Sequence, residues 1–429
     1  MTHLLRHPLL QKIRHAYRRI FSVAEIEEST HLRLAFGTIL LSFLVTFYRG
    51  WGPYAPLTVE AYKQNAYVCW PYFEDCGKYF FLHQTPYGYS QHILFTIILC
   101  MMFLIVYRAY HNDWTSAHAL LSLIWLFKML VTFVLSYTLA QNYDYFDLLA
   151  GTILLFIPYK LFFLRLMFVL IYFISAALKF DDGWVLGSYF TTLRLGLPIF
   201  GKTLTPLITN FVVFMEIVGC WFLFSRTKFL QRSAFLLFLT FHIYSSIIIN
   251  YRFPLLAIPL LVTLFGIDFL PPRVPLDRRS LAGWLLLCLF FGMQGMRILI
   301  PGDEKLTMEG YRLGIYLFDA NHQCKSHMLV QYRSGGIKEV EKEYPYAFNR
   351  CDPYRNLFWA RQECERDPDI ATIAWTFDHS ADGGPYYRIV DEKNACALPY
   401  SLFSHNAWIR LPKDSPSIVG YPVENTYGL

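Results

Sequence analysis

The sequence predicts a polytopic α-helical membrane protein with about nine transmembrane helices, followed by a C-terminal, β-rich extracytoplasmic domain. Three observations predict this fold class. Of the 429 residues, 55% are hydrophobic and only 16% are charged. The mean hydropathy of +0.32 lies above the range of an ordinary soluble domain. The apolar residues gather in separate long runs, and residues 301–429 contain no such run.

Residues 1–31 predict an amphipathic helix that lies on the inner surface of a membrane. Basic and apolar side chains alternate there at roughly helical spacing. The basic set is Arg6, Lys12, Arg14, Arg18 and Arg19, and the apolar set is Leu9, Leu10, Ile13, Tyr17, Ile20 and Phe21. Ser29 and Thr30 then offer an N-cap for the first long apolar run.

The apolar runs that follow are mostly close to the ~20 residues that a membrane span needs. They cover residues 34–48, 91–107, 116–139, 147–163, 166–180, 206–225, 233–250, 253–270 and 280–299. Basic residues are concentrated in one alternate set of loops, which the positive-inside rule places in the cytoplasm. The N-terminus is therefore predicted to be cytoplasmic, and the segment after Arg297 to be periplasmic or lumenal. This topology requires two helices between residues 147 and 180, since one bent span would invert everything after it.

Residues 301–429 predict a compact extracytoplasmic domain. The segments "HMLVQYRSGGIKEVEKEY" and "IATIAWTFDHSADGGPYYRIV" alternate apolar and polar residues around glycine-rich turns. Each predicts a β-hairpin, with turns at Ser334-Gly335-Gly336 and Asp382-Gly383-Gly384. Between them, "PYRNLFWARQECER" has helical spacing. The predicted domains are residues 1–31, a transmembrane domain of residues 32–300, and residues 301–429.

Ionisable residues within the apolar runs are the candidates for chemistry, because burying them is costly. No P-loop, HExxH motif, CxxC pair or Rossmann glycine fingerprint is present. The candidates are Lys128, Lys179, Glu216 and His242, with Asn142, Tyr143 and Asp144 at the end of one helix. Each has a structural alternative. Packing or snorkelling is the favoured interpretation of Lys128, and spacing alone favours an interfacial anchor for Lys179. A buried glutamate or histidine can bridge helices by hydrogen bonds.

Four segments occur in an order that is typical of one family of membrane proteins. They are "IYFISAALKFDDGWVLGSYF", "FHIYSSIIINYRFPLLAIPLL", "EKLTMEGYRLGIYLF" and "YYRIVDEKNACALPYSLFSHNAW". These segments resemble the vitamin K-dependent gamma-carboxylase and its bacterial relatives with the horizontally transferred transmembrane (HTTM) domain. The likeness runs from the first apolar run to about Trp408. The lysine-bearing segment is its most specific part.

The resemblance implies a lyase-type enzyme in which Lys179 acts as the base toward reduced vitamin K or another quinol, with no metal. Oxygenation of the quinol then yields a strong base that removes a glutamate γ-proton, and carbon dioxide adds to the carbanion. A lysine must be neutral to accept a proton, and burial favours its neutral form. Asn142 is expected to orient the reacting group, and Tyr143 stands where the family has a histidine. The residues assigned to quinol binding are Glu216, His242 and Trp184.

The resemblance also implies a disulfide bond between Cys69 and Cys364. Further pairs can come from Cys76, Cys324, Cys351 and Cys396, and we predict Cys76 with Cys351. The implied partners are membrane lipids, a quinone, and a protein or peptide substrate or other membrane subunits. The net charge of +6 is spread over loops, which argues against nucleic acid.

Two alternatives to carboxylation stay open. One is a related quinol or lipid reaction on a different substrate, and the other is a non-catalytic scaffold or subunit of a larger membrane complex. The animal carboxylases continue beyond the position of Leu429 through a region that helps hold a substrate propeptide, so the resemblance does not extend to that substrate. A transporter is disfavoured, because no inverted repeat is evident.

Overall fold

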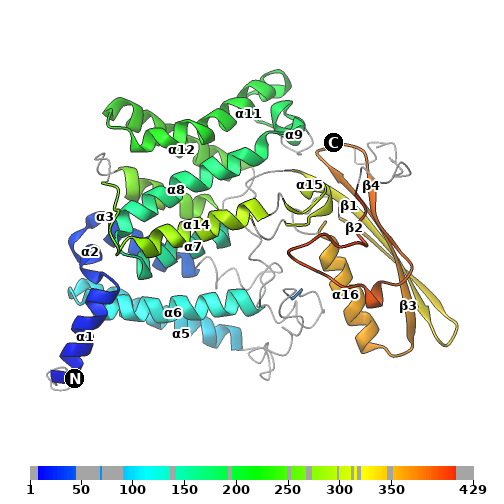
Figure 1. Cartoon of the computed structure of the whole chain (residues 1–429), viewed down its shortest axis with the longest axis horizontal. Coiled ribbons are helices and arrows are strands. Elements are labelled where there is room, and N and C mark those ends of the chain that lie inside the picture. Colours follow the sequence, from blue (N-terminus) through cyan, green and yellow to red (C-terminus); the bar gives the residue numbers. More distant parts are fainter. Residues whose placement is uncertain are drawn as a thin grey trace. The chain divides into compact units, whose positions relative to one another are not determined.

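A computed structural model describes residues 8–44, 68–69, 90–135, 142–191, 196–248, 253–266, 273–296, 299–310, 314–315, 320–344 and 351–411. The chain forms two compact units (Figure 1). Unit 1 comprises Met1–Ile174 and Glu216–Phe290, and unit 2 comprises Ser175–Met215 and Phe291–Leu429. The domain boundaries predicted at residues 31 and 300 stay a prediction.

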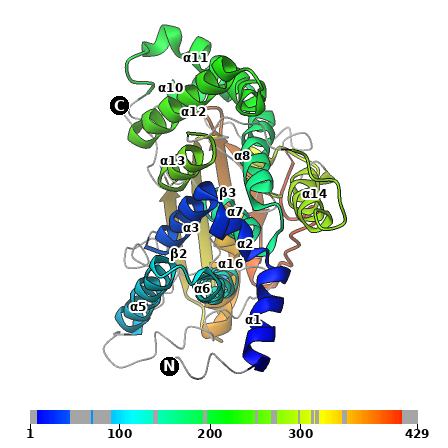
Figure 2. The same ribbon diagram turned by 90° about the vertical axis from the view of Figure 1, so that its left-hand side faces the viewer.

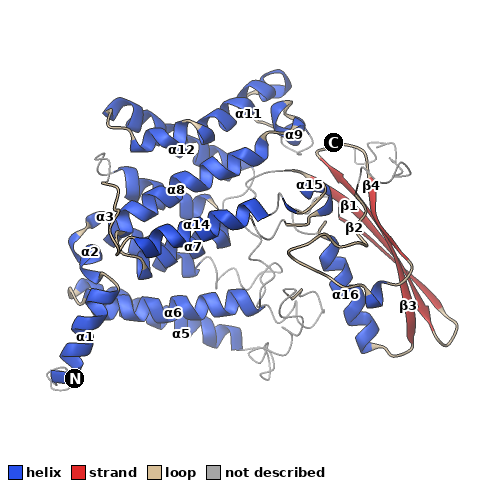
Figure 3. Ribbon diagram, in the orientation of Figure 1, coloured by secondary structure: helices blue, strands red, loops and turns tan. Residues whose placement is uncertain are grey.

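Unit 1 is built from helices (Figure 3). Within it, α5 and α6 pack side by side (Figure 2). In its interior the centroid of the Phe146 ring lies 5.9 Å from that of Phe168 and 5.2 Å from that of Phe253. The helices of unit 1, some of which continue into unit 2, are α1 (Pro8–Ile20), α2 (Val23–Glu28), α3 (Thr30–Phe43), α5 (Ser90–Tyr110), α6 (Trp114–Leu135), α7 (Asn142–Phe156), α8 (Lys160–Ala176), η8 (Gly219–Phe224), α12 (Lys228–Ile248), α13 (Pro254–Leu261), η9 (Val262–Gly266) and α14 (Leu281–Met296).

The predicted transmembrane helices are contradicted. Over the part of the chain that the structure describes, none of the helices combines the length and the apolar character that crossing a membrane requires. Four of those over the predicted runs, α3, α7, α8 and α14, have 14, 15, 17 and 16 residues, fewer than the ~20 of a span. The longer α5, α6 and α12 carry charged residues, for example Arg108, Lys128 and Arg232.

The predicted fold class and localisation are wrong for the same reason. Both depended on the spans, since the positive-inside rule assigns a side only to loops between membrane-crossing helices. The multi-pass topology, the cytoplasmic N-terminus and the extracytoplasmic placement of the C-terminal segment are therefore corrected together with the spans. The structure is mostly helical, with one antiparallel sheet near the C-terminus.

The region between residues 147 and 180 forms two helices, but they meet earlier than predicted. α7 ends at Phe156 and α8 begins at Lys160, so the break falls inside the predicted run 147–163. Pro158 accounts for this position, because a proline disfavours the helical conformation of the residue before it and cannot donate a backbone hydrogen bond. Tyr159 then takes a left-handed conformation with φ 58°. Glu25 accepts hydrogen bonds from the backbone N–H groups of Tyr159 and Lys160 and thereby caps α8.

Unit 2 is built around an antiparallel sheet of four strands in the order β2-β1-β3-β4. The strands are β1 (His322–Tyr332), β2 (Ile337–Tyr344), β3 (Ile370–Ala381) and β4 (Tyr387–Glu392). The helices of this unit are η7 (Ala177–Lys179), α9 (Asp182–Val185), α10 (Ser188–Thr191), α11 (Gly201–Ile217), α15 (Glu304–Thr307), α16 (Pro353–Arg366) and η12 (Ala395–Ala397), of which α11 continues into unit 1.

Both predicted hairpins are confirmed. β1 pairs with β2 and β3 pairs with β4, each antiparallel. In the second turn Asp382 and Gly383 have φ 54° and 73°, and the Gly384 N–H donates to the Ala381 carbonyl at 2.9 Å. Positive φ at both central residues defines a type I′ turn, for which Asp-Gly is a favoured pair. In the first turn Gly335 takes φ 97°.

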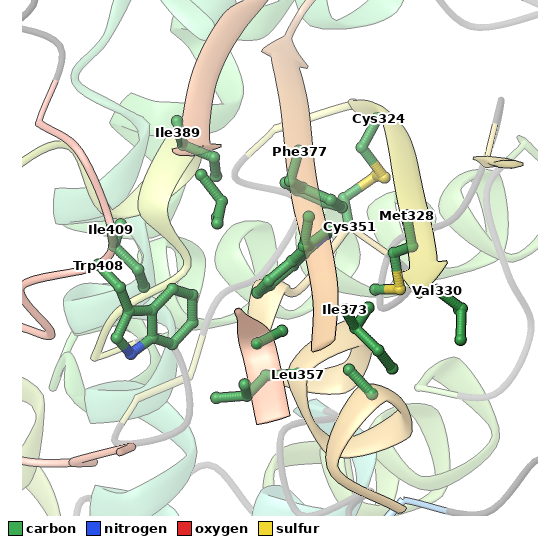
Figure 4. Close-up of a cluster of buried hydrophobic side chains, with 14 of the residues drawn as sticks. Cys324, Met328, Val330, Cys351, Leu357, Ile373, Phe377, Ile389, Trp408 and Ile409 are labelled. Atoms are coloured by element: carbon green, nitrogen blue, oxygen red, sulfur yellow. A yellow bond between two sulfur atoms is a disulfide. The ribbon is translucent and has the colours of Figure 1, made fainter. Parts of the chain in front are cut away.

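The predicted helix between the hairpins is also confirmed, as α16. Asp352 is its N-cap, and its side chain accepts a hydrogen bond from the Tyr354 N–H at 2.9 Å. α16 packs against β3. Figure 4 shows the core of this unit, where Leu357 from the helix lies among Met328, Ile373 and Phe377 from the strands.

The predicted disulfide between Cys69 and Cys364 is wrong. Cys364 of α16 is bonded to Cys396 of η12, with Cα atoms 5.9 Å apart. The predicted partner of Cys76 is also wrong, because Cys351 is bonded to Cys324. Cys69 is disulfide-bonded as well, and Cys76 lies outside the described residues. In both described pairs the fold brings together cysteines about 30 residues apart, whereas the prediction joined segments far apart in the chain.

Candidate functional site

The Lys179 amine lies in the interior of unit 2. α8 tightens at its end into the 3-10 turn η7, whose last residue is Lys179. The side chain is fully buried, and Nζ lies 4.6 Å from the centroid of the Trp184 ring. Trp184 is itself buried and stacks on Tyr189, with centroids 5.7 Å apart. A cation over an indole face is attracted by the ring, so Trp184 stabilises the protonated form of this lysine.

Asp181, two residues after Lys179, forms hydrogen bonds with the backbone and an ion pair with Lys305. Asp181 Oδ1 accepts hydrogen bonds from the N–H groups of Gly183 (2.7 Å) and Trp184 (3.3 Å), which caps the short helix α9. Its Oδ2 forms an ion pair with Lys305 Nζ of α15. The side chain of Lys305 is only 14% exposed, so this pair is largely shielded from solvent.

Lys305 lies among three carboxylates. In addition to Asp181, the carboxyl groups of Asp303 and Asp382 interact electrostatically with the charge of Lys305. Burial raises the pKa of Asp382 to about 6, and hydrogen bonding from Asn321 together with the charge of Lys305 acts in the opposite direction. The close packing here requires a glycine at position 183. A Cβ atom on Gly183 would lie 2.2 Å from Asp382 Oδ2.

Two buried histidines connect this cluster to the sheet. His379 of β3 is hydrogen-bonded through Nδ1 to the Leu306 carbonyl at 2.5 Å, and its Nε2 lies 3.1 Å from Nδ1 of His322. A carbonyl only accepts, so His379 Nδ1 carries a proton and, in the neutral ring, Nε2 accepts from His322. Burial lowers the pKa of His379 to about 4, and it also lowers the pKa of His322.

Sequence reasoning missed Lys305, Asp303, Asp382, His322 and His379. Lys305 lies in a segment quoted for the resemblance, but no pattern singled it out, because its partner Asp181 is more than a hundred residues earlier. His379 lies in a predicted hairpin, where alternation alone does not separate a buried polar residue from a surface one, and His322 lies before the start of the other predicted hairpin. For Lys305 the sequence signal was its position next to the apolar Leu306, in a short turn that Asp303 caps.

Glu216 and His242, both assigned to quinol binding, lie in the interior of unit 1. His242 Nε2 is 2.5 Å from the hydroxyl oxygen of Tyr172, and all three side chains are buried. Burial raises the pKa of Tyr172, and the charge of Glu216 adds to this effect. The Tyr172 hydroxyl therefore stays protonated and donates a hydrogen bond to His242 Nε2. This contact joins α8 to α12. It agrees with the structural alternative for His242, a histidine that is hydrogen-bonded between helices.

Tyr143 also belongs to unit 1. Its hydroxyl donates to the Ser42 carbonyl at 3.4 Å, and the Ser42 hydroxyl accepts from Lys128 Nζ at 3.1 Å. Lys128 is ion-paired with Asp147, and its amine lies 4.8 Å from the Phe43 ring centroid. Lys128 therefore does not snorkel, since its charge is paired in the interior, and its structural role in the packing of unit 1 agrees with the other part of that interpretation.

Four of the six predicted site residues are thus found in two groups. Lys179 lies with Trp184 in unit 2, and Glu216 and His242 lie around Tyr172 in unit 1. The backbone of Asn142 begins α7, but its side chain lies outside the described part of the structure. A single site that unites both groups with Asn142 and Tyr143 stays a prediction.

Two of the segments that were quoted for the resemblance contact each other in unit 2. Glu309, from "EKLTMEGYRLGIYLF", is buried and accepts hydrogen bonds from Asn406, through its N–H at 2.7 Å and Nδ2 at 2.9 Å. His405 Nδ1 lies 2.8 Å from the other oxygen of Glu309. Asn406 and His405 belong to "YYRIVDEKNACALPYSLFSHNAW". A buried carboxylate with this many donors fixes the loop that precedes Trp408.

The part of the chain that the structure describes holds no group of three or more His, Cys, Asp or Glu side chains placed to bind a metal ion. No family model matches the chain, and no match was found among curated proteins or solved structures.

Proposed function

We propose that this chain is a carboxylase-like enzyme coupled to quinol oxidation, in which Lys179 is the base. The observation that carries the proposal is the fully buried amine of Lys179 against the Trp184 ring. Burial disfavours the charged form of an amine, so a buried lysine can accept a proton at neutral pH. Reduced vitamin K or a related quinol, when bound, supplies the hydroxyl proton and the electrons for reaction with oxygen.

The surroundings of Lys179 suit both forms that a base must adopt. The Trp184 ring stabilises the ammonium that forms when Nζ takes the proton. The Asp181 carboxylate, two residues after Lys179, is engaged in the ion pair with Lys305. An amine beside aromatic rings also matches the chemistry of a planar phenolic ligand.

Replacement of Lys179 tests the proposal. In Lys179→Ala and in Lys179→Arg we expect quinol-dependent fixation of carbon dioxide into a glutamate-containing peptide to fall by at least ~100-fold, because general-base catalysis contributes about that much. Arginine fails as well, since it stays protonated in proteins. Oxidation of the quinol is followed in the same reactions. Lys202→Ala, which removes an exposed lysine of the same unit, serves as the matched control and retains activity.

Activity that persists in Lys179→Arg would contradict the assignment of the base. Quinol oxidation that depends on Lys179 without incorporation of carbon dioxide would keep the base and overturn carboxylation.

A further inference from the structure

The helix α1 of unit 1 has one side fixed to the protein by polar contacts. Arg14 donates to Asp113 at 2.7 Å, and the Tyr17 hydroxyl lies 2.8 Å from Nδ1 of His118. Arg18 forms an ion pair with Glu27. These anchors set the rotation of α1 about its own axis, so its opposite side is a defined surface.

That opposite side exposes a stripe of apolar residues. Leu9, Ile13, Ala16 and Ile20 follow one another at intervals of four, three and four residues, so at 100° per residue they fall within about 60° of arc. Leu9, Ile13 and Ile20 are 59%, 56% and 64% exposed, although hydrophobic side chains of this size are usually buried. We call these four residues the α1 stripe.

Basic side chains border the α1 stripe. Lys12 and Arg19 are seven residues apart, project next to the stripe on the same side, and are exposed. Neither forms an ion pair within the described part of the chain, in contrast to Arg14 and Arg18. The exposed His15 lies beyond them on the same side. The outer side of α1 therefore offers apolar contact and uncompensated positive charge together.

We infer that the α1 stripe with Lys12 and Arg19 binds the surface of an anionic lipid bilayer. An amphipathic helix with apolar side chains on one face and lysine or arginine beside them lies in the headgroup region. Burial of the apolar side chains and attraction of the cations to anionic lipids both contribute to its binding free energy. Charge complementarity selects the anionic surface, because phosphate-rich headgroups match the two free cations. A helix of 13 residues is about 20 Å long, so this is a surface contact and no span. The inference does not rest on the proposed function.

Co-sedimentation of the purified full-length protein with lipid vesicles tests the inference. We expect binding to vesicles of phosphatidylcholine with phosphatidylserine, much weaker binding to phosphatidylcholine alone, and a decline with added salt. Lys12→Ala and Arg19→Ala should each weaken binding by about fivefold. The pair of changes Leu9→Glu and Ile13→Glu should weaken it by at least ~10-fold, because both apolar contacts are lost and negative charge is added.

The matched control is Ile337→Glu, since Ile337 is 71% exposed but belongs to the strand β2 and not to α1. It should leave vesicle binding unchanged, and unaltered circular dichroism shows that the α1 variants keep their fold. Equal binding to anionic and neutral vesicles, or wild-type binding by the α1 variants, would overturn the inference. Absence of vesicle binding together with capture of an acidic protein would overturn it in favour of a protein partner.

Discussion

The buried ion pair between Lys128 and Asp147 predicts that the loss of either partner alone destabilises unit 1. Both side chains are almost fully buried, so each charge depends on the other for its stabilisation. Removal of one partner leaves an uncompensated charge in the interior, whereas removal of both charges together does not. Asp147→Leu and Lys128→Met should each lower the free energy of unfolding by about 3–5 kcal/mol. The double change Lys128→Met with Asp147→Leu should recover most of that loss.

Denaturant unfolding of the single and double variants measures this coupling as a double-mutant cycle. Additive losses in the cycle would show that the two charges act independently, contrary to the buried pair. Removal of an exposed charge in the same unit, as in Lys228→Ala, provides the baseline for a surface change.

For single residues, the free-energy cost of burying an ionisable group pointed to side chains that are indeed buried. It did not identify the residues with which they interact. Lys179, Glu216 and His242 were selected because ionisable groups in apolar runs are expensive, and all three are buried. Asp181–Lys305 and Tyr172–His242 each join residues that are distant in the chain. No local pattern encodes such a pair, so these contacts could not be predicted from one sequence.

At the scale of elements, the hairpins and α16 were predictable because their signals are local. A turn that needs positive φ selects glycine or aspartate at fixed positions, as at Asp382 and Gly383. Asp352 and Pro353 likewise mark the first turn of α16. The limits of α7 and α8 were misplaced, because hydropathy continues through Pro158 while the helical backbone does not.

The disulfide pairing belongs to this scale as well. The Cys364–Cys396 bond ties α16 to the segment after β4 and closes a loop of 32 residues. In the chain-entropy model its loss in Cys396→Ser should cost about 3–4 kcal/mol. Because α16 covers β3, the amides of both elements should then exchange faster with deuterium, whereas those of α5 and α6 should not change.

Peptide mapping of the non-reduced protein provides the control for that measurement. It should yield Cys324–Cys351 and Cys364–Cys396 as linked peptides. A peptide linking Cys69 to Cys364 would instead restore the pairing that the structure contradicts.

At the scale of the whole molecule, composition was a poor guide to architecture. Apolar content and run length predicted membrane spans, and no helix in the described ranges meets both requirements. Polar and charged residues lie within α12, and a turn divides the run 206–225 into shorter helices at η8. Average hydropathy does not register where a backbone helix begins and ends.

The stability of unit 2 should depend on pH through groups that act in opposite directions. The pKa of Asp382 is raised in the folded state, to about 6, so its contribution favours folding at low pH and is lost as the pH rises from about 4 through 6. The pKa of His379 is lowered to about 4, and that of His322 is lowered too. Their contribution is present above about pH 6.5 and is lost as the pH falls toward 4.

Burial also raises the pKa of Asp303, so two aspartates act against the two histidines. Because the pKa of His322 lies well below its ordinary value, the histidines outweigh the aspartates, and acidification from pH 7 to 4.5 should destabilise unit 2. The shift of His379 alone corresponds to about 3 kcal/mol, at 1.36 kcal/mol per pKa unit. Asp382→Asn removes one opposing contribution and should make the loss of stability on acidification steeper, whereas His379→Gln should make it shallower. Hydrogen exchange of the β1 and β3 amides, corrected for the intrinsic pH dependence of exchange, measures both slopes against wild type. A shallower slope in Asp382→Asn would mean that this carboxylate is ionised throughout the range, and the cluster around Lys305 would then be a network of formed charges.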